Sequence, residues 1–133
     1  MTNETLFKAD SVLCDLRVSS KKQLFQEMAA KLVETGELSD SKIATRDIVA
    51  AAMERERLGT TGVGSGVALP HARLEGVKKI HVVFARLESP LDYDAIDERP
   101  VDLAALLIAP ANAGGAHLRA LACLLYTSDA ADE

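Results

Sequence analysis

One stretch of ten residues, VDLAALLIAP at 101–110, constrains the fold of this chain more than any other part of the sequence. It is apolar apart from one aspartate, and its longest uninterrupted apolar run, residues 103–109, is too short to span a bilayer. A nearly continuous apolar run of this length is typical of a central β-strand that is covered on both faces. Such a strand needs further layers of structure around it, so the run predicts a layered domain.

A helix is predicted ahead of this strand. Ser20 is suited to be its N-cap, and Gln23, three residues later, can complete a capping box. Apolar residues then recur at helical spacing along one face until Gly36, which ends the pattern. The same spacing predicts a second helix over about residues 45–57, ended by Gly59.

Other apolar segments predict strands. They lie at residues 10–18 and 80–87, and a polar connection with two prolines, residues 89–100, leads to the central strand. From about residue 116 onward the pattern is helical again. Helices that alternate with apolar strands predict the α/β class, here a single domain with a mixed β-sheet flanked by helices.

Length and composition narrow the classes of function. The chain of 133 residues has the size of one domain, and its 20 acidic and 15 basic residues give a net charge of −5. An acidic chain without a basic patch is a poor candidate for binding nucleic acid or an anionic membrane. Two cysteines are too few for a disulfide scaffold or a zinc site, and the N-terminus shows no secretory pattern. We therefore expect a cytoplasmic domain, and with 4% aromatic residues its core must be aliphatic.

The densest chemical signal is the segment RERLGTTGVGSGVALPHAR, residues 55–73. It combines two arginines at a predicted helix end, a glycine-rich loop at 59–66 and a histidine after a proline. Arginines can bind a phosphate, and the N–H groups of a glycine loop can form an anion-binding nest. The neutral imidazole of His71 can act as a nucleophile near pH 7. The segment thus contains the parts that phosphoryl transfer requires.

Plainer interpretations of the same segment remain open. A glycine loop is most often only a turn, and a lone histidine is most often an exposed or capping residue. The glycines lack the spacing of a Rossmann fingerprint, and no Gly-Lys-Ser/Thr follows them as in a P-loop. A small nucleotide-binding domain that uses the glycine loop stays as an unrelated alternative, for which ATP binding would be the test.

The segment resembles the phosphorylation-site motif of bacterial phosphotransferase system (PTS) enzyme IIA domains of the fructose, mannitol and nitrogen-regulatory type. That motif reads approximately R-E-x-x-G-[ST]-T-G-x-G-x-G-[VI]-A-[IL]-P-H-[GA]-[RK], and this chain matches it in order from Arg55 to Arg73. Ala72 stands where glycine is commoner. The resemblance covers nearly all of residues 5–122 and implies the α/β fold of the type-2 IIA domains.

The resemblance also implies roles for single residues. His71 would accept a phosphoryl group on Nε2 from the phosphohistidine of an HPr-type carrier, assisted by Arg55 and by His117 as the second site histidine. No metal or other cofactor is needed, because the donor is already activated and arginine supplies positive charge. Thr61 is expected to hydrogen-bond the imidazole or a nearby carbonyl. The residues expected to support the phosphate and the loop are Thr61, Gly62, Gly64, Gly66 and Arg73.

The stretch LESPLDYDAIDERPVDL resembles the nitrogen-regulatory branch of the family. This implies a phosphoryl carrier that signals through phosphorylation-dependent binding to client proteins, with no nucleic acid among its partners and no insertion into the membrane. Two alternatives remain open. One is a sugar-transport IIA subunit of the fructose or mannitol type, which passes its phosphate to a IIB domain. The other is a binding module without catalytic activity.

The last eleven residues, CLLYTSDAADE at 123–133, resemble a translated sequencing adapter. On this interpretation the IIA domain occupies residues 1–122 and is incomplete at its C-terminus, and residues 123–133 are a tail foreign to the gene. Members of the family continue for one or two further helices. We therefore expect an apolar face of the domain to be uncovered and the chain to be less stable than a restored version.

Overall fold

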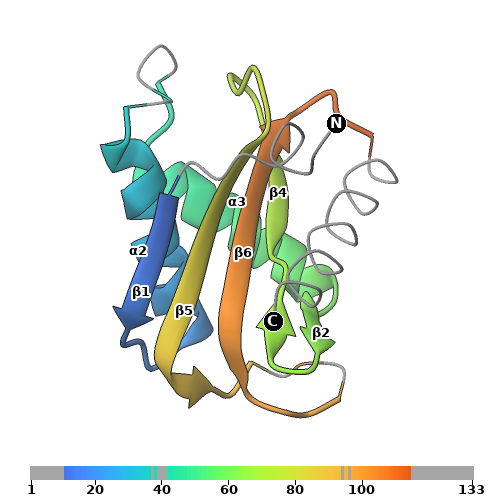
Figure 1. Ribbon diagram of the computed structural model, residues 1–133. Helices are drawn as coiled ribbons and strands as arrows, with labels where there is room; N and C mark the ends of the chain where they lie inside the picture. Colours follow the sequence, from blue (N-terminus) through green and yellow to red (C-terminus); the bar gives the residue numbers. More distant parts are fainter. Residues whose placement is uncertain (1–10, 37, 39–41, 94, 96, 115–133) are drawn as a thin grey trace, which may run out of the picture.

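The computed structural model describes residues 11–36, 38, 42–93, 95 and 97–114, and this part of the chain forms two helices and six strands (Figure 1). In chain order they are β1 (Ser11–Leu16), α2 (Lys21–Glu34), α3 (Thr45–Leu58), β2 (Gly62–Gly64), β3 (Val67–Ala68), β4 (His71–Leu74), β5 (His81–Leu91) and β6 (Val101–Pro110). Both predicted helices and the central strand lie within two residues of their expected bounds.

The described strands form one mixed sheet in the order β1-β5-β6-β3-β2, and β4 also pairs with β6, further along that strand than β3. Strand β6 runs antiparallel to β5 and parallel to β3 and β4, and β1 runs parallel to β5. The predicted α/β class with a mixed sheet is confirmed. The apolar run at 101–110 is an interior strand of the sheet, because β5 pairs along one of its edges and β3 and β4 pair along the other.

The side chains of β5 and β6 alternate between the two faces of the sheet. One set, which includes Val83 and Leu106, packs with Phe25 and Met28 of α2 in the main core. The two described helices lie behind the sheet in Figure 1, on this same face. The other set forms smaller apolar clusters on the opposite face together with Leu69, and its members are Val82, Phe84, Ala105, Leu107 and Ala109. Residues 104–109 are all buried, as a strand covered on both faces requires.

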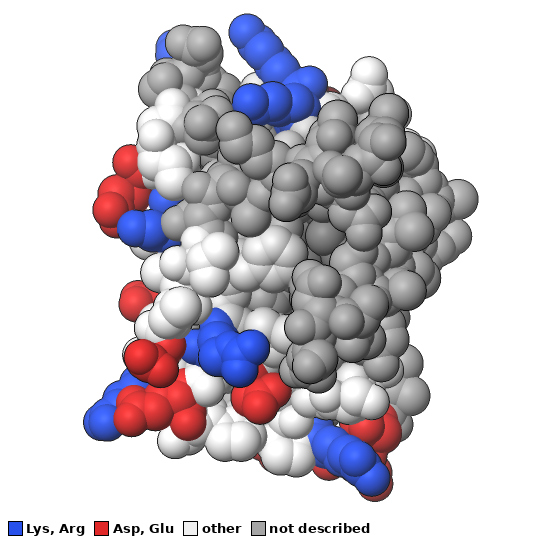
Figure 2. Space-filling view, viewed as in Figure 1, with Lys and Arg blue, Asp and Glu red and all other residues white. Residues whose placement is uncertain are grey.

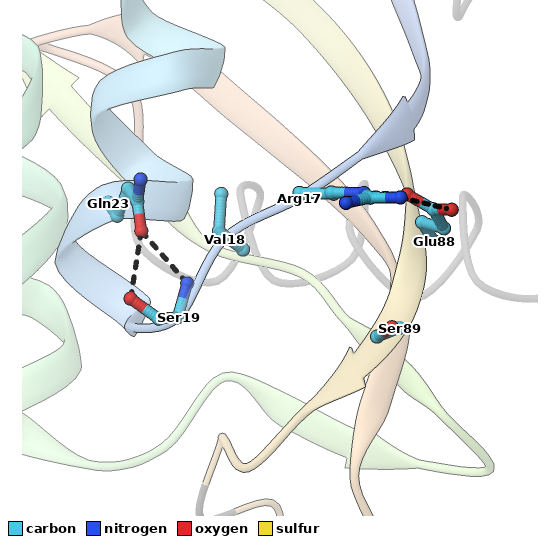
Figure 3. Close-up of a pocket in the computed structure, with 6 residues that line it drawn as sticks. All are labelled: Arg17, Val18, Ser19, Gln23, Glu88 and Ser89. Atoms are coloured by element: carbon cyan, nitrogen blue, oxygen red, sulfur yellow. Dashed lines mark hydrogen bonds and ion pairs between the residues drawn. The ribbon is translucent and has the colours of Figure 1, made fainter.

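The start of α2 shows how the short link from β1 is held (Figure 3). The hydroxyl of Ser20 accepts a hydrogen bond from the backbone N–H of Gln23 at 3.1 Å, as predicted for an N-cap. The side-chain oxygen of Gln23 accepts a hydrogen bond from the backbone N–H of Ser19 at 2.8 Å, and Ser19 is the residue before the N-cap. Arg17 forms an ion pair with Glu88 of β5. A surface hollow of about 510 Å³ is lined in part by two pairs of side chains that bind each other, Arg17 with Glu88 and Ser19 with Gln23.

Several elements differ from their predicted form. Strand β5 continues to Leu91 through Ser89 and Pro90, which the sequence assigned to a polar connection. The helical pattern from residue 116 and the tail at 123–133 lie outside the described residues. In the part of the chain that is described, neither helix is long and apolar enough to cross a membrane.

Charged side chains of both signs lie close together on the face shown in Figure 2. Along the lower edge of this view, Lys and Arg side chains lie beside Asp and Glu side chains. Neighbouring opposite charges cancel much of each other's field at a distance. The lower edge of this face therefore carries no field of a single sign.

Candidate functional site

His71 opens strand β4, directly after Pro70, and both of its ring nitrogens are engaged. Nδ1 lies 2.9 Å from the backbone carbonyl oxygen of Leu69, and Nε2 lies 3.3 Å from Nε of Arg55. A carbonyl oxygen can only accept a hydrogen bond and a guanidinium can only donate one. The two contacts therefore assign the neutral tautomer, with the proton on Nδ1 and a lone pair on Nε2. The residue is 8% exposed.

Arg55 reaches His71 from the last turn of α3. Its Nη1 donates to the carbonyl oxygen of Gly59 at 2.9 Å, at the C-terminal end of the same helix. The last carbonyls of a helix have no partner within it and attract a cation. The guanidinium is thus held at both ends, by a helix terminus and by the imidazole. The structure brings together the two residues that the motif places 16 positions apart.

Arg57 does not join Arg55 at His71. Its guanidinium binds Glu54 on the exposed side of α3, with Nε 3.1 Å from a carboxylate oxygen. Residues two apart on a helix point to different sides, so one phosphate cannot reach both arginines easily. Of the two arginines, Arg55 is the one that contacts the imidazole.

The glycine-rich loop folds into a tight hairpin made of β2 and β3. Ser65 and Gly66 form its turn with φ of 58° and 81°, and two positive φ angles are typical of a type I′ turn. The N–H of Ser65 donates to the Asp97 carboxylate at 3.0 Å. The carbonyl oxygen of Gly66 accepts a hydrogen bond from the backbone N–H of Asp102 at 3.0 Å. The loop therefore differs from the expected anion nest, because strand pairing and the Asp97 carboxylate use its polar groups. Gly64, with φ of 104°, lies beside the same carboxylate.

Gly62 is required by close packing. A Cβ at this position would lie 2.7 Å from the Cβ of Ala95 and 3.0 Å from the ring of Tyr93. Its N–H donates to the hydroxyl of Thr60 at 3.1 Å. This strand thus lies against the chain that follows β5 because the residue has no side chain.

Thr61 supports the site in a way that the sequence did not predict. Its hydroxyl lies 2.5 Å from Oε2 of Glu56 and 2.7 Å from the hydroxyl of Tyr93. These two groups, and not the expected imidazole, are therefore the hydrogen-bond partners of the Thr61 hydroxyl. Its backbone N–H donates to Oε1 of Glu56 at 3.0 Å. Its carbonyl oxygen accepts from the N–H of Leu69 at 2.9 Å, and Leu69 is the residue whose own carbonyl binds His71.

Glu56 is the centre of a buried polar network. Besides both groups of Thr61, its carboxylate accepts from Nζ of Lys21 at 2.9 Å and from the hydroxyl of Tyr93 at 3.2 Å. Burial acts to raise the pKa of Glu56, but the hydrogen bonds from Thr61 and Lys21 outweigh it and hold that pKa below its usual value. Burial first, and then the charge of Glu56, raise the pKa of Tyr93 far above its usual range. The carboxylate is therefore ionised and the phenol neutral.

The sequence analysis gave no role to three members of this network, namely Glu56, Lys21 and Tyr93. Glu56 stands inside the motif next to Arg55, and that position was the available signal. Lys21 and Tyr93 lie 35 and 37 residues away from it and carried no signal. Lys21 also lies over the ring of Tyr93, 4.3 Å from its centroid, as in a cation–π contact.

Arg73 and His81 make other contacts. Nη1 of Arg73 donates to the carbonyl oxygen of Ala113 at 2.9 Å, after the end of β6. His81 is buried in β5, where its backbone is paired with Ile108. His117 lies outside the described residues. Within the residues that are described, no cluster of three or more His, Cys, Asp or Glu side chains is placed to hold a metal ion.

The geometry favours attack by a neutral nitrogen on an electrophile that carries negative charge. The Nε2 lone pair faces the Arg55 guanidinium, which can stabilise charge that develops close to it. The Nδ1 proton is held by Leu69, so the ring needs no base to become nucleophilic.

Comparisons with known proteins show which proteins this chain is similar to. The family model "Phosphoenolpyruvate-dependent sugar phosphotransferase system, EIIA 2" matches residues 5–133. A nitrogen regulatory protein of Bradyrhizobium diazoefficiens is 47% identical over 118 residues, which cover 88% of this chain and 73% of that protein. A fructose-specific EIIA component of Haloferax volcanii is 39% identical over 92 residues, or 69% of this chain and 57% of its own length. The crystal structure of the nitrogen regulatory protein IIA-Ntr from Neisseria meningitidis is similar with a TM-score of 0.71 and 40% identity, over 86% of this chain and 75% of that one.

Proposed function

The chain belongs to the EIIA 2 family of the phosphoenolpyruvate-dependent sugar phosphotransferase system, and from this premise we propose that it is a phosphohistidine carrier of the nitrogen-regulatory type. His71 accepts a phosphoryl group from the phosphohistidine of an HPr-type carrier protein. The observation that carries this proposal is the pair of contacts on the imidazole, because they leave a lone pair on Nε2 and a guanidinium beside it.

The transfer step exchanges one P–N bond for another. Nε2 of His71 attacks the phosphorus in line, and the donor imidazole leaves with the electron pair of the bond that breaks. The acceptor ring keeps its Nδ1 proton throughout, so the positive charge that grows on it is stabilised by the Leu69 carbonyl. Because a phosphohistidine is consumed and another is formed, the transfer is close to balanced and reversible.

Arg55 has two successive roles in this proposal. Before transfer its Nε–H donates to Nε2, which orients the imidazole. As phosphorus approaches, the same donor passes to a phosphoryl oxygen, while Nη1 stays anchored on Gly59. The transition state of phosphoryl transfer is loose and spreads negative charge over the equatorial oxygens, so a fixed cation stabilises it. We assign His117 a similar supporting role, by family resemblance.

The regulatory output follows from the added charge. A phosphoryl group brings nearly two negative charges to a position close to Arg55. Any partner surface that docks over His71 then meets a different electrostatic field in the two states. The protein therefore binds one set of clients when phosphorylated and another when it is not.

The proposal is tested by incubating the protein with phosphoenolpyruvate, PTS enzyme I and an HPr-type carrier, then measuring intact mass under alkaline conditions. One acid-labile phosphoryl group is expected on the wild type and none on His71→Gln. His117→Gln is expected to be phosphorylated more slowly, and His81→Gln at the wild-type rate. A wild-type protein that takes no phosphate would favour the non-catalytic binding module.

The similarity to a fructose-specific EIIA component supports a second candidate, a sugar-transport subunit. Such a subunit would pass its phosphoryl group to a IIB domain. The test adds fructose-type and mannitol-type IIB domains to the phosphorylated protein and follows the label. Rapid transfer to either domain would identify a transport subunit, and retention on His71 would support the regulator.

A further inference from the structure

We propose that Glu56 is a positioning residue that fixes the tautomer of His71, and that it acts through the backbones of Thr61 and Leu69. The importance of this tautomer for catalysis rests on the proposed function, because a phosphoryl acceptor needs its lone pair on Nε2. The structural relay itself consists of contacts that are present in the unphosphorylated protein.

The relay begins at the imidazole. Nδ1–H of His71 donates to the carbonyl of Leu69 at 2.9 Å, and the N–H of Leu69 donates to the carbonyl of Thr61 at 2.9 Å. Thr61 and Leu69 flank the β2–β3 hairpin, so the bond between them closes the base of that hairpin. The position of the Leu69 carbonyl therefore depends on where Thr61 is held.

Glu56 holds Thr61 at two points, with one carboxylate oxygen on each. Oε1 accepts the Thr61 backbone N–H at 3.0 Å and Oε2 accepts the Thr61 hydroxyl at 2.5 Å. Lys21 and Tyr93 add a second donor to each oxygen, at 2.9 Å and 3.2 Å. Lys21 and the Thr61 N–H can only donate, so Oε1 must be an unprotonated acceptor. The hydroxyls of Thr61 and Tyr93 also lie 2.7 Å apart, so their two protons serve three contacts. Glu56 is 9% exposed, so a lost partner is poorly replaced by water.

An amide in place of the carboxylate would break this arrangement without changing its size. A glutamine presents one oxygen and one NH₂ group. With its NH₂ toward Lys21 and the Thr61 N–H, two obligate donors would face a donor. With its NH₂ toward the Thr61 and Tyr93 hydroxyls, one hydroxyl proton would lose its acceptor and Lys21 would lose its ion pair. Thr61 would then shift, and the Leu69 carbonyl with it. An imidazole that loses its Nδ1 acceptor is free to carry its proton on Nε2, and that tautomer has no lone pair for attack.

The experiment compares Glu56→Gln with the full-length wild type by two measurements. The first is the pair of ¹⁵N chemical shifts of the His71 ring in unphosphorylated protein, which report the tautomer directly. The second is the rate of phosphoryl transfer from the HPr-type carrier over a range of carrier concentrations. We expect the shifts of Glu56→Gln to move toward a mixture of tautomers. We also expect its maximal rate to fall at least tenfold, with little change in the carrier concentration that gives half of it.

Glu54→Gln is the matched control. Glu54 lies on the same helix, is exposed and binds Arg57, so its amide variant should keep wild-type shifts and rate. A second pair of variants covers the case in which Glu56→Gln does not fold. Thr61→Val removes the hydroxyl and should shift the ¹⁵N signals in the same direction, and Thr61→Ser keeps the hydroxyl and should restore them.

The outcomes separate the relay from the proposed function. Wild-type ¹⁵N shifts in folded Glu56→Gln, or in folded Thr61→Val where Glu56→Gln does not fold, would overturn the relay. A wild type that takes no phosphate would overturn the proposed function, and the ¹⁵N shifts would still decide the relay. A slower Glu56→Gln with unchanged shifts would place the effect elsewhere than the tautomer and would also overturn the relay.

Discussion

At His71, chemistry depends on which ring nitrogen carries the proton, and a donor and an acceptor on opposite sides of the ring decide it. Arg55 is the donor and Leu69 is the acceptor. Arg55 also carries the nearest fixed positive charge to Nε2. It therefore serves the resting imidazole and the transition state, and its removal should affect the rate more than the stability.

Arg55→Ala is expected to slow phosphoryl transfer to His71 by roughly 100-fold, the usual cost of losing one donor to a developing charge. The unfolding free energy should change by less than about 1.5 kcal/mol, because the residue makes two hydrogen bonds at a half-buried position. Rapid-quench rates and denaturant unfolding measure the two quantities. Arg57→Ala is the control, and an unchanged rate in Arg55→Ala would remove that residue from the mechanism.

Glu56 should make stability depend on pH in a definite direction. Its pKa in the folded protein lies below the usual 4.5, because the bonds from Thr61 and Lys21 outweigh burial. A group of this kind stabilises the fold fully above its unfolded pKa and loses that effect as pH falls through its folded pKa. The gap in unfolding free energy between the wild type and Glu56→Gln should therefore stay constant near neutral pH and narrow below about pH 4.5.

Denaturant unfolding of both proteins from neutral pH down to about pH 3 measures this gap. Glu54→Gln should show a much smaller gap, because Glu54 is exposed and paired only with Arg57. A gap that widened on acidification would mean that the folded pKa of Glu56 is raised, which contradicts the network described here.

Among the elements, the β2–β3 hairpin joins the glycine motif to the histidine. Its base is closed by Thr61 and Leu69, and its turn is held by Asp97. The glycines allow this shape to form. Glycine is required at position 62 because there is no space for a side chain. At position 66 it adopts a φ of 81°, which other residues rarely adopt.

Gly62→Ala tests the packing limit. The new methyl group would lie 2.7 Å from the Cβ of Ala95, and a backbone shift would be needed to admit it. We expect a loss of about 1–3 kcal/mol in unfolding free energy, as for other overpacked sites. Val63→Ala in the same strand is the control, because Val63 is exposed and should change stability by less than about 0.5 kcal/mol. Equal midpoints for the two variants would show that the strand has room for a side chain.

Local patterns predicted the elements that depend on local rules. The Ser20 N-cap bounds α2, and Gly59 follows the last turn of α3, because capping is decided within a few residues. The apolar run at 101–110 predicted the central strand, because a strand that is buried on both faces is apolar at nearly every residue. The motif gave His71 and Arg55, because the helix end and the strand start that carry them lie close in sequence.

The parts that were missed depend on contacts that are distant in sequence. Tyr93 and Lys21 reach Glu56 from a loop and from another helix, and no spacing rule connects them. The sequence did not distinguish Arg57 from Arg55, because the turn of helix that directs Arg57 toward Glu54 is seen only in the structure. Asp97 accepts the N–H of Ser65 from 32 residues away, and no local pattern predicts this contact.

For the molecule as a whole, the sheet is apolar on both faces. The main core joins one face to α2 and α3, and the clusters around Val82 and Leu107 lie on the other face. Neither described helix covers that second face (Figure 1). Val82 and Leu107 on that face are nevertheless buried, so the uncovered apolar face expected from the sequence is not found on the described strands.

We propose that residues 123–133 are foreign to the gene, and sequencing of the genomic locus tests this directly. A chain with the genomic C-terminus restored is expected to unfold at higher temperature and higher denaturant concentration than the chain printed here. The reason is that further helices would bury more apolar surface. A chain that ends at residue 122 is the control. Equal denaturation midpoints for the restored and printed chains would contradict the expectation.

Lys21 is the first residue of α2, and it is the cation that binds Glu56. The Glu56 carboxylate is therefore paired with the residue at which α2 begins. A one-residue insertion or deletion between β1 and α2 would rotate the helix start by about 100° and direct this lysine elsewhere. The link at residues 17–20 lies at the surface, where loops usually vary in length. Here the length of the link sets which residue lies beside Glu56, so we expect a change in its length to be tolerated less well than a change in its side chains.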